Sequence, residues 1–199
     1  MDAWQPLLDW WFGAEAPAAE VAAARHGLWF GKRDEQDREA EQRFGVQVRQ
    51  ALSGGLQDWK QSPQGWLALL ILLDQLPRMI FRNTPQAFAG DPLALALLED
   101  GLAKQWDRRL PPIRRVFAYL ILEHAEDPLL QDRAVACFRV LLNEATEEER
   151  GLFANFLEFA ERHQQVIRLF GRFPHRNAIL GRHSSPKEVA FLGEPGSRF

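Results

Sequence analysis

Residues 112–128 read PIRRVFAYLILEHAEDP, and this stretch decides the fold class. Its apolar residues recur three, four, seven and eight positions after Ile113, which is the spacing of one face of an α-helix. The stretch ends in Asp127-Pro128, where a carboxylate able to cap a helix precedes a proline suited to the first helical turn. It therefore predicts an amphipathic helix followed directly by the start of another.

The same signals recur along the chain. A capping residue precedes proline at Ser62, Asp91 and Ser185, and Thr146 and Ser185 each have a glutamate three residues later, as in a capping box. Strand-like alternation is nearly absent, so we expect an all-α protein of about nine to ten helices. We expect the helices near residues 4–12, 17–31, 35–53, 63–82, 92–105, 112–125, 128–143, 147–170, 174–182 and 186–192.

Length and spacing predict a single domain over residues 1–199. Successive capped starts lie 29 residues apart from Ser62 to Asp91 and 36 apart from Asp91 to Asp127. These distances approach the roughly 34-residue period of tetratricopeptide helix pairs. We therefore expect a tetratricopeptide-like solenoid of antiparallel helix pairs, although an irregular helical bundle would give similar spacings.

Composition argues against several classes of protein. The 199 residues are 46% hydrophobic and 26% charged, as in an ordinary globular protein. The single cysteine leaves no intrachain disulfide and no CxxC zinc pair, which favours a reducing compartment. The first residues lack signal-peptide features, and the longest apolar run, 66–73, is too short to span a membrane. We expect a cytoplasmic protein without a membrane segment.

Positive charge is concentrated at the C-terminal end. Residues 161–199 hold seven Lys/Arg and three Asp/Glu, a balance of +4, whereas residues 1–160 hold 17 and 24, a balance of −7. An anionic partner would be drawn to the basic end, although a solvated basic face gives the same counts. Nucleic acid is not the expected partner, because the chain is acidic overall and its aromatic residues lie mainly on apolar stripes.

The densest polar block is residues 171–182, GRFPHRNAILGR. The N-terminus of the helix expected at 174–182 would offer unpaired N–H groups to an anion, and arginine suits bidentate capture of carboxylate or phosphate. Alternatively, these arginines pair with Asp74 or Glu126 and only tie the C-terminus down. The candidate ligand-binding residues of the block are Arg172, His175, Arg176 and Asn177.

A second polar group, residues 74–78 (DQLPR), ends the most apolar expected helix. Pro77 lacks an N–H and clashes with the carbonyl group of Leu73, so we expect a kink there. The kink would aim Asp74, Gln75 and Arg78 into a cavity. A structural Asp–Arg pair that closes a helix corner is the alternative.

Three histidines are candidates for acid–base chemistry. His124, close to Glu126, and His163 lie on the apolar faces of their expected helices, and His175 follows in the basic block. Each alone is typical of a satisfied buried histidine, but together they could line one pocket. None of them has the HExxH spacing of a zinc site, and we predict neither a metal nor a cofactor.

Several motifs carry a family resemblance. They are residues 10–13 (WWFG), 72–78 (LLDQLPR), 88–94 (FAGDPLA), 124–127 (HAED) and the long ending 163–182. Through them nearly the whole chain resembles the bacterial family of uncharacterised proteins called domain of unknown function 924. The resemblance implies an all-helical, tetratricopeptide-like fold and no established activity.

The leading hypothesis is one polar pocket that binds a small anionic ligand, a carboxylate or a phosphate. In it Arg172 and Arg176 hold the anion, and Asp74 fixes an arginine. The expected lining residues are Asp74, Gln75, Arg78, His124, Glu126, His163, Arg172, His175, Arg176 and Asn177. Two alternatives are a scaffold that binds a peptide or partner protein on a concave face, and a hydrolase or lyase with a histidine acid or base. The sequence does not set the oligomeric state.

Overall fold

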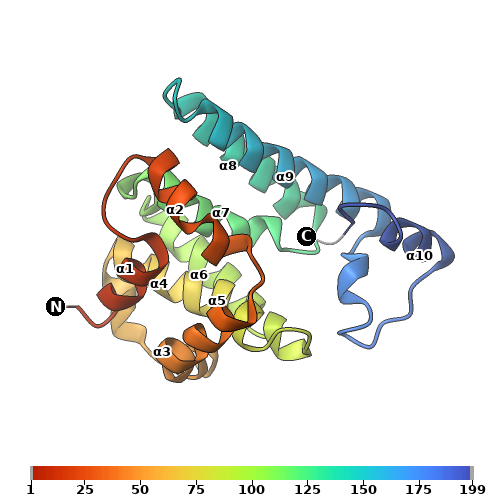
Figure 1. Cartoon of the computed structure of the whole chain (residues 1–199), viewed down its shortest axis with the longest axis horizontal. Coiled ribbons are helices and arrows are strands. Elements are labelled where there is room, and N and C mark those ends of the chain that lie inside the picture. The colour runs from red at the N-terminus through yellow and green to blue at the C-terminus, as the bar shows by residue number, and fades with distance from the viewer. Residues whose placement is uncertain (1, 198–199) are drawn as a thin grey trace.

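The computed structural model describes residues 2–197, and over these residues all regular secondary structure is helical. The α-helices are α1 (Gln5–Phe12), α2 (Ala18–Phe30), α3 (Asp34–Leu52), α4 (Pro63–Leu73), α5 (Gln75–Ile80), α6 (Asp91–Ala103), α7 (Pro112–Glu123), α8 (Pro128–Glu144), α9 (Arg150–Phe170) and α10 (Pro186–Leu192). The 3-10 helices are η1 (Gln57–Gln61), η2 (Pro85–Phe88), η3 (Asp107–Arg109) and η4 (Pro174–Arg176). The all-α prediction is confirmed (Figure 1).

Helix α4 lies at the centre of the molecule. Ten of its eleven residues are buried, and it contacts α1, α3, α5, α6 and α7. A helix that is apolar on every side needs such neighbours all round it. Because α4 contacts more than the helices next to it in sequence, the solenoid of stacked helix pairs is not confirmed.

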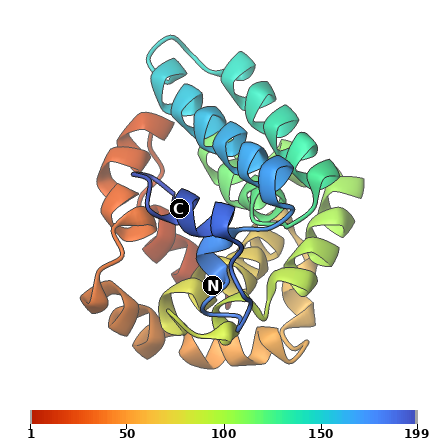
Figure 2. The same cartoon turned by 90° about the vertical axis from the view of Figure 1, so that its right-hand side faces the viewer.

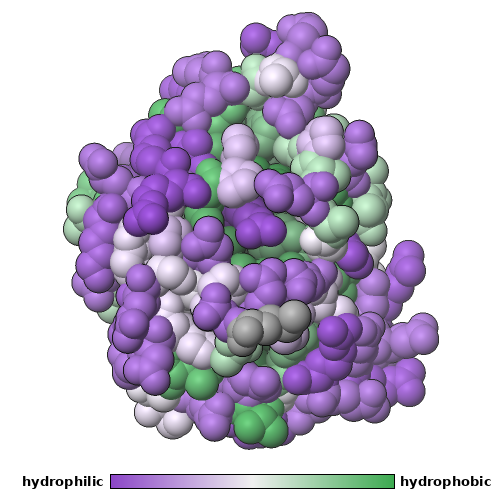
Figure 3. Space-filling view, turned by 90° about the vertical axis from the view of Figure 1, so that its left-hand side faces the viewer, coloured by the Kyte–Doolittle hydropathy of each residue, from purple (hydrophilic) through white to green (hydrophobic). Residues whose placement is uncertain are grey.

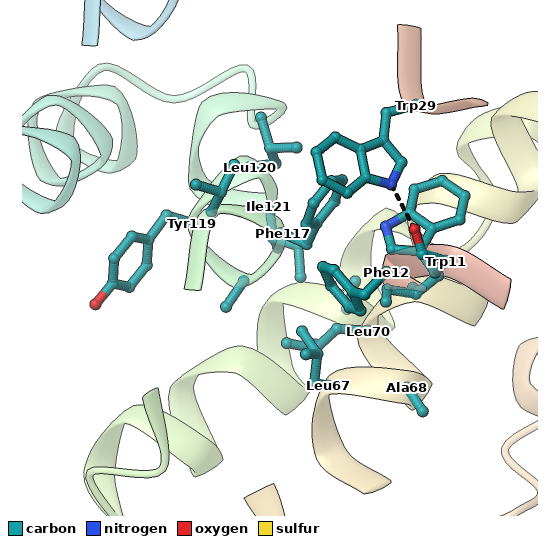
Figure 4. Packing of buried hydrophobic residues seen from close by; sticks show 14 of the residues in the cluster. Trp11, Phe12, Trp29, Leu67, Ala68, Leu70, Phe117, Tyr119, Leu120 and Ile121 are labelled. Carbon is teal, nitrogen blue, oxygen red and sulfur yellow. Dashed lines mark hydrogen bonds between the residues drawn. The ribbon is translucent and has the colours of Figure 1, made fainter. Parts of the chain in front are cut away.

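An aromatic cluster joins α1, α2 and α7 (Figure 4). The ring of Phe117 on α7 lies 5.4 Å from that of Trp11, 5.3 Å from that of Phe12 and 4.7 Å from that of Trp29, in edge-to-face arrangements. The indole nitrogen of Trp29 donates to the carbonyl oxygen of Trp11 over 2.9 Å. The stripe that begins at Ile113 therefore faces the core, as its spacing predicts.

Helices α8 and α9 form a long antiparallel pair that extends away from the rest of the bundle (Figure 1). Helix α9 ends at Gly171, whose φ of 68° is the left-handed conformation that glycine adopts readily. From there the chain turns back across the face of the molecule seen in Figure 2, where it carries η4 and α10. This turn brings the basic block of residues 171–182 against the body of the protein.

Three of the predicted helix starts are confirmed. The hydroxyl group of Ser62 accepts from the backbone N–H of Gly65, and the carboxylate of Asp127 accepts from two backbone N–H groups at the start of α8. Ser185 and Glu188 form the predicted capping box of α10. Each cap thus fixes the first turn of its helix.

Two predicted caps are wrong, because tertiary contacts take the side chains. Asp91 is the first residue of α6 and makes no cap bond, since its carboxylate binds Arg78. The start predicted near Thr146 moves to Arg150, and the carboxylate of Glu149 accepts instead from the backbone N–H of Ala18. Side chains that can cap a helix are equally good partners for more distant donors.

The expected helix 63–82 is interrupted at Asp74, which separates α4 from α5. The cause is the predicted one, since Pro77 cannot donate to the carbonyl group of Leu73 four residues earlier. That carbonyl lies directly against Gly90, where a Cβ atom would overlap it. The interruption confirms the kink and brings the end of α4 close to the start of α6.

The helix expected at 174–182 is wrong. Only Pro174–Arg176 forms a single 3-10 turn, and the following residues form successive turns. The backbone N–H of Arg182 donates to the carbonyl oxygen of Asn177 over 2.8 Å, and the Arg182 side chain bonds to Glu126. These bonds fold the segment into a compact loop, so no helix N-terminus is available to hold an anion.

Gly101 offers a test of the packing of α4 against α6. A Cβ atom at residue 101 would overlap the indole ring of Trp66, which is fully buried. We expect Gly101→Ala to lower the free energy of unfolding by about 1–3 kcal/mol, measured by urea denaturation. Gly151→Ala is the control, because no atom lies within 4 Å of its Cβ position, and it should raise stability slightly. Equal effects of the two substitutions would contradict this packing.

The face opposite the C-terminal segment is mainly hydrophilic (Figure 3). Large apolar side chains that are exposed are spread over several elements, for example Val46 on α3 and Leu129 on α8. This face therefore shows no broad apolar surface of the kind that an interaction scaffold would use. Among residues 2–197, no helix is long and apolar enough to cross a membrane.

Candidate functional site

A buried carboxylate, Asp74, lies at the break between α4 and α5 and is 1% exposed. It accepts from the side-chain amide of Gln75 and from Nδ1 of His124 over 2.7 Å, and it forms an ion pair with the Arg78 guanidinium at 3.1 Å. Burial alone would raise the pKa of Asp74, but the charge of Arg78 and the contact with His124 outweigh burial and hold that pKa well below its usual range. The carboxylate is therefore ionised at neutral pH.

Arg78 links this carboxylate to α6. Its guanidinium makes a bidentate pair with Asp91, at 2.8 and 3.1 Å, and also donates to the backbone carbonyl of Asp74. We call Asp74, Gln75, Arg78, Asp91 and His124 the Asp74 cluster. It contains the Asp–Arg pair expected at this corner and adds Asp91, which the sequence analysis assigned only to capping. The FAGDP motif, residues 88–92, is the signal that could have indicated it.

Glu126 forms a second network with the C-terminal segment. Its carboxylate pairs with both terminal nitrogens of Arg182, at 2.6 and 2.9 Å, and accepts from the backbone N–H of Phe173 over 2.8 Å. Arg182 also donates to the side-chain oxygen of Asn177 over 3.0 Å. Glu126 thus anchors the loop, as the alternative interpretation proposed, but through Arg182.

We expect Arg172 to hold an anion, but in the structure its guanidinium pairs with a carboxylate of the protein. Its guanidinium makes a bidentate pair with Glu188 on α10, at 2.7 and 2.8 Å, and donates to the backbone carbonyl of His183. Asn177 donates to Ser184 and Glu188. The structure therefore commits Arg172 and Asn177 to holding α10, because a nearby carboxylate satisfies them.

His163 on α9 lies beside the buried carboxylate of Glu123. Its Nδ1 atom lies 3.0 Å from the carboxylate oxygen of Glu123 and 2.8 Å from the carbonyl oxygen of Phe159. Glu123 is 3% exposed and ends α7, and the side-chain amide of Gln131 donates to the carbonyl groups of Glu123 and Ala125. Glu123 and Gln131 were not predicted as site residues, although Glu123 directly precedes His124.

Arg176 differs from the other arginines of this region. Its guanidinium packs against the rings of Phe88, with the centroid at 4.8 Å, and Phe173, at 4.6 Å, and the residue is only 6% exposed. Within residues 2–197 the guanidinium makes no hydrogen bond, and its Nε atom is buried without a partner. Its nearest carboxylate oxygen, on Asp91, lies 3.7 Å away. Burial, together with the charge of Arg78, lowers the pKa of Arg176 to about 10.

His175 and His124 are neutral at physiological pH. Burial, followed by the charges of Arg176 and of His163, lowers the pKa of His175 to about 3. Burial also lowers the pKa of His124, and the nearby Asp74 only partly opposes this effect. Because His124, His163 and Arg176 all act on His175, the structure brings the predicted histidines into one region of the molecule.

The arrangement contains carboxylates, histidines and cations but no metal site. Among the described residues, no group of three His, Cys, Asp or Glu side chains could hold a metal ion. Two surface hollows lie elsewhere, one lined mainly by α3 and the other by α8 and α9. What distinguishes the region chemically is therefore a buried cation next to neutral histidines.

The fold and this region define an all-helical protein with a buried cluster of arginines, carboxylates and histidines. Residues 7–196 match the family model described as bacterial protein of unknown function (DUF924). The chain belongs to this family.

A protein of unknown function from Agrobacterium tumefaciens, ATU0120, has a similar solved structure. It is 33% identical in sequence, with a TM-score of 0.72, and the similarity covers 88% of this chain and 98% of that one. None of the curated proteins compared with the chain matches it. The comparisons confirm the family and the helical fold.

Proposed function

We propose that the protein binds a small oxyanion, a carboxylate or a phosphate, at the guanidinium of Arg176. One contrast carries this proposal. Arg78, Arg172 and Arg182 each make a bidentate pair with a carboxylate, whereas the guanidinium of Arg176, which is more buried than any of these three, makes no hydrogen bond within residues 2–197. A buried cation without hydrogen bonds is costly, and a bound anion would supply the missing acceptors.

The surroundings of Arg176 favour a bound anion, and not another carboxylate of the protein, as its hydrogen-bond acceptor. The guanidinium carbon lies over the rings of Phe88 and Phe173, so a ligand would bind through the N–H groups. Asp91 already pairs with Arg78, which leaves Arg176 incompletely neutralised. Burial and the charge of Arg78 lower the pKa of Arg176, and the nearby carboxylates only partly oppose these effects.

Arg176→Met tests the proposal, because methionine retains an apolar stem between the two rings and removes the charge. We expect inorganic phosphate or acetate to raise the melting temperature of the wild-type protein, and the variant to bind at least about tenfold more weakly. Without ligand, the variant should be at least as stable as the wild type, since the unpaired buried charge is gone. Calorimetric titration and thermal melting measure the two effects.

Arg168→Met is the matched control. Arg168 also lies near the C-terminal end of the chain, but it is exposed and pairs with Asp132 on the surface. Its substitution should leave anion binding unchanged. Wild-type affinity in Arg176→Met, or equal losses in both variants, would contradict a site at Arg176.

A second function, histidine acid–base catalysis, has one observation in its favour. Asp74 contacts Nδ1 of His124, and Glu123 contacts Nδ1 of His163. A carboxylate on Nδ1 orients the ring and leaves Nε2 as the proton acceptor, which is the arrangement used by many general bases. This function requires a substrate whose reacting group reaches Nε2.

A further inference from the structure

The protonation of His124 follows from its partner. Nδ1 lies 2.7 Å from an oxygen of Asp74, which also faces Gln75 and Arg78. An ionised carboxylate can only accept hydrogen bonds, so Nδ1 carries the proton of the neutral ring. The opposite nitrogen, Nε2, therefore presents a lone pair.

Nε2 of His124 has no partner among residues 2–197. Nε2 is not one of the side-chain atoms that are both fully buried and without a hydrogen bond, and the His124 side chain is 17% exposed. Solvent therefore reaches Nε2. The charged and titratable groups that face the ring are Asp74, Arg78, Arg176 and His175. The two cations oppose a second proton on the ring, so Nε2 stays an acceptor.

Arg176 adjoins the Asp74 cluster, because it lies 3.7 Å from Asp91, which pairs with Arg78, and Asp74 contacts both Arg78 and His124. An anion held by Arg176 would therefore lie beside the cluster to which the acceptor on His124 belongs. A fully deprotonated anion has only lone pairs to offer to Nε2, which is unfavourable beside a ring that is mostly buried. An oxyanion that also carries an O–H group can donate to Nε2 while its charged oxygens accept from Arg176. A ligand of this site must therefore offer charged oxygens to Arg176 and an O–H group to Nε2, and few small anions offer both.

We propose that His124 selects oxyanions that carry a hydroxyl donor, such as a phosphate that retains a proton or a hydroxycarboxylate, over anions of similar shape without one. This inference rests on the proposed anion site at Arg176. It makes His124 the residue that determines specificity, and Asp74 the positioning residue that fixes the ring.

Two pairs of simple anions test the selection by calorimetric titration at about pH 6. Inorganic phosphate is mostly singly charged and carries O–H groups at this pH, whereas sulfate is doubly charged and carries none. Charge alone would favour sulfate at Arg176, but we expect phosphate to bind about tenfold more tightly. Glycolate should likewise bind more tightly than acetate, and comparison of the two pairs shows whether the ligand class is a phosphate or a carboxylate.

His124→Asn removes the acceptor and keeps the contact with Asp74, because its amide nitrogen can occupy the position of Nδ1. We expect this variant to lose the preference for phosphate over sulfate while it still binds both through Arg176. His183→Asn, on an exposed loop, is the control and should keep the preference. A preference that survives in His124→Asn would overturn the role of His124.

The outcomes separate the two proposals. If phosphate and sulfate bind equally to the wild-type protein and both depend on Arg176, the anion site stands and the selection by His124 fails. If neither binds, or binding survives Arg176→Met, both proposals fail. Nitrogen-15 chemical shifts of the wild-type histidines need no variant: a neutral His124 ring protonated on Nε2 would overturn the inference.

Discussion

Replacing Asp74 with alanine is expected to lower the free energy of unfolding by about 3–5 kcal/mol. The substitution removes the carboxylate that Gln75, Arg78 and His124 all contact. It leaves the amide of Gln75 and Nδ1 of His124 without this acceptor, and Arg78 with Asp91 as its remaining carboxylate. The loss is large because the groups that remain cannot reach water to recover their hydrogen bonds. Urea denaturation at neutral pH measures the effect.

The pH dependence of the free energy of unfolding tests whether the ionised carboxylate of Asp74 causes this loss of stability. Because folding depresses the pKa of Asp74, its stabilisation is present above about pH 4, the ordinary range for this carboxyl, and is lost progressively as the pH falls below it. The difference between wild type and Asp74→Ala should therefore shrink in acid. Asp132→Ala is the control, since its pair with Arg168 is exposed and should contribute at most about 1 kcal/mol. Similar losses in both variants would contradict the special role of burial.

Phe117→Ala should destabilise the protein by a comparable amount, about 3–5 kcal/mol. Phe117 is 1% exposed and contacts Trp11, Phe12 and Trp29, so its removal leaves a cavity where α1, α2 and α7 meet (Figure 4). The surrounding indole rings are too rigid to close this cavity fully. Chemical denaturation, with tryptophan fluorescence as the probe, reports directly on this cluster.

Phe117→Leu and Phe30→Ala are the controls for that substitution. Leucine keeps most of the buried volume, so we expect Phe117→Leu to cost clearly less than Phe117→Ala. Phe30 is 40% exposed, so its truncation should have a small effect. A loss in Phe30→Ala as large as that in Phe117→Ala would show that the aromatic cluster does not stabilise the bundle in the way described.

The limits of the helices were predictable wherever no distant residue competed for the capping side chain or proline that marks them. Ser62, Asp127 and Ser185 cap the helices that they precede, and the kink at Pro77 follows from the missing N–H and the geometry of the proline ring. Asp91 shows where such reasoning stops. Its position before a proline suggests a cap, but a guanidinium from α5 binds the carboxylate instead.

The candidate site was predictable in its residue types and only partly in its pairings. Asp74, Arg78 and His124 do come together, and the basic block does return to the body of the protein. The assignment of partners was beyond the sequence, because Arg172, Arg176 and Arg182 are chemically alike and lie within eleven residues of one another. Which of them lacks a carboxylate depends on where α10 and Glu126 lie.

By itself, the sequence determined the helical class, most helix limits and the polar residues available for a site, because these depend on interactions between residues close together in the chain. Tertiary structure alone decided that residues 174–182 form a loop instead of a helix, and that the buried guanidinium of Arg176 makes no hydrogen bond within the described part of the chain. The reason is that carboxylates far away in sequence, on Glu126, Glu188 and Asp91, satisfy the neighbouring arginines first. Their positions follow from the packing of whole helices, which no short stretch encodes.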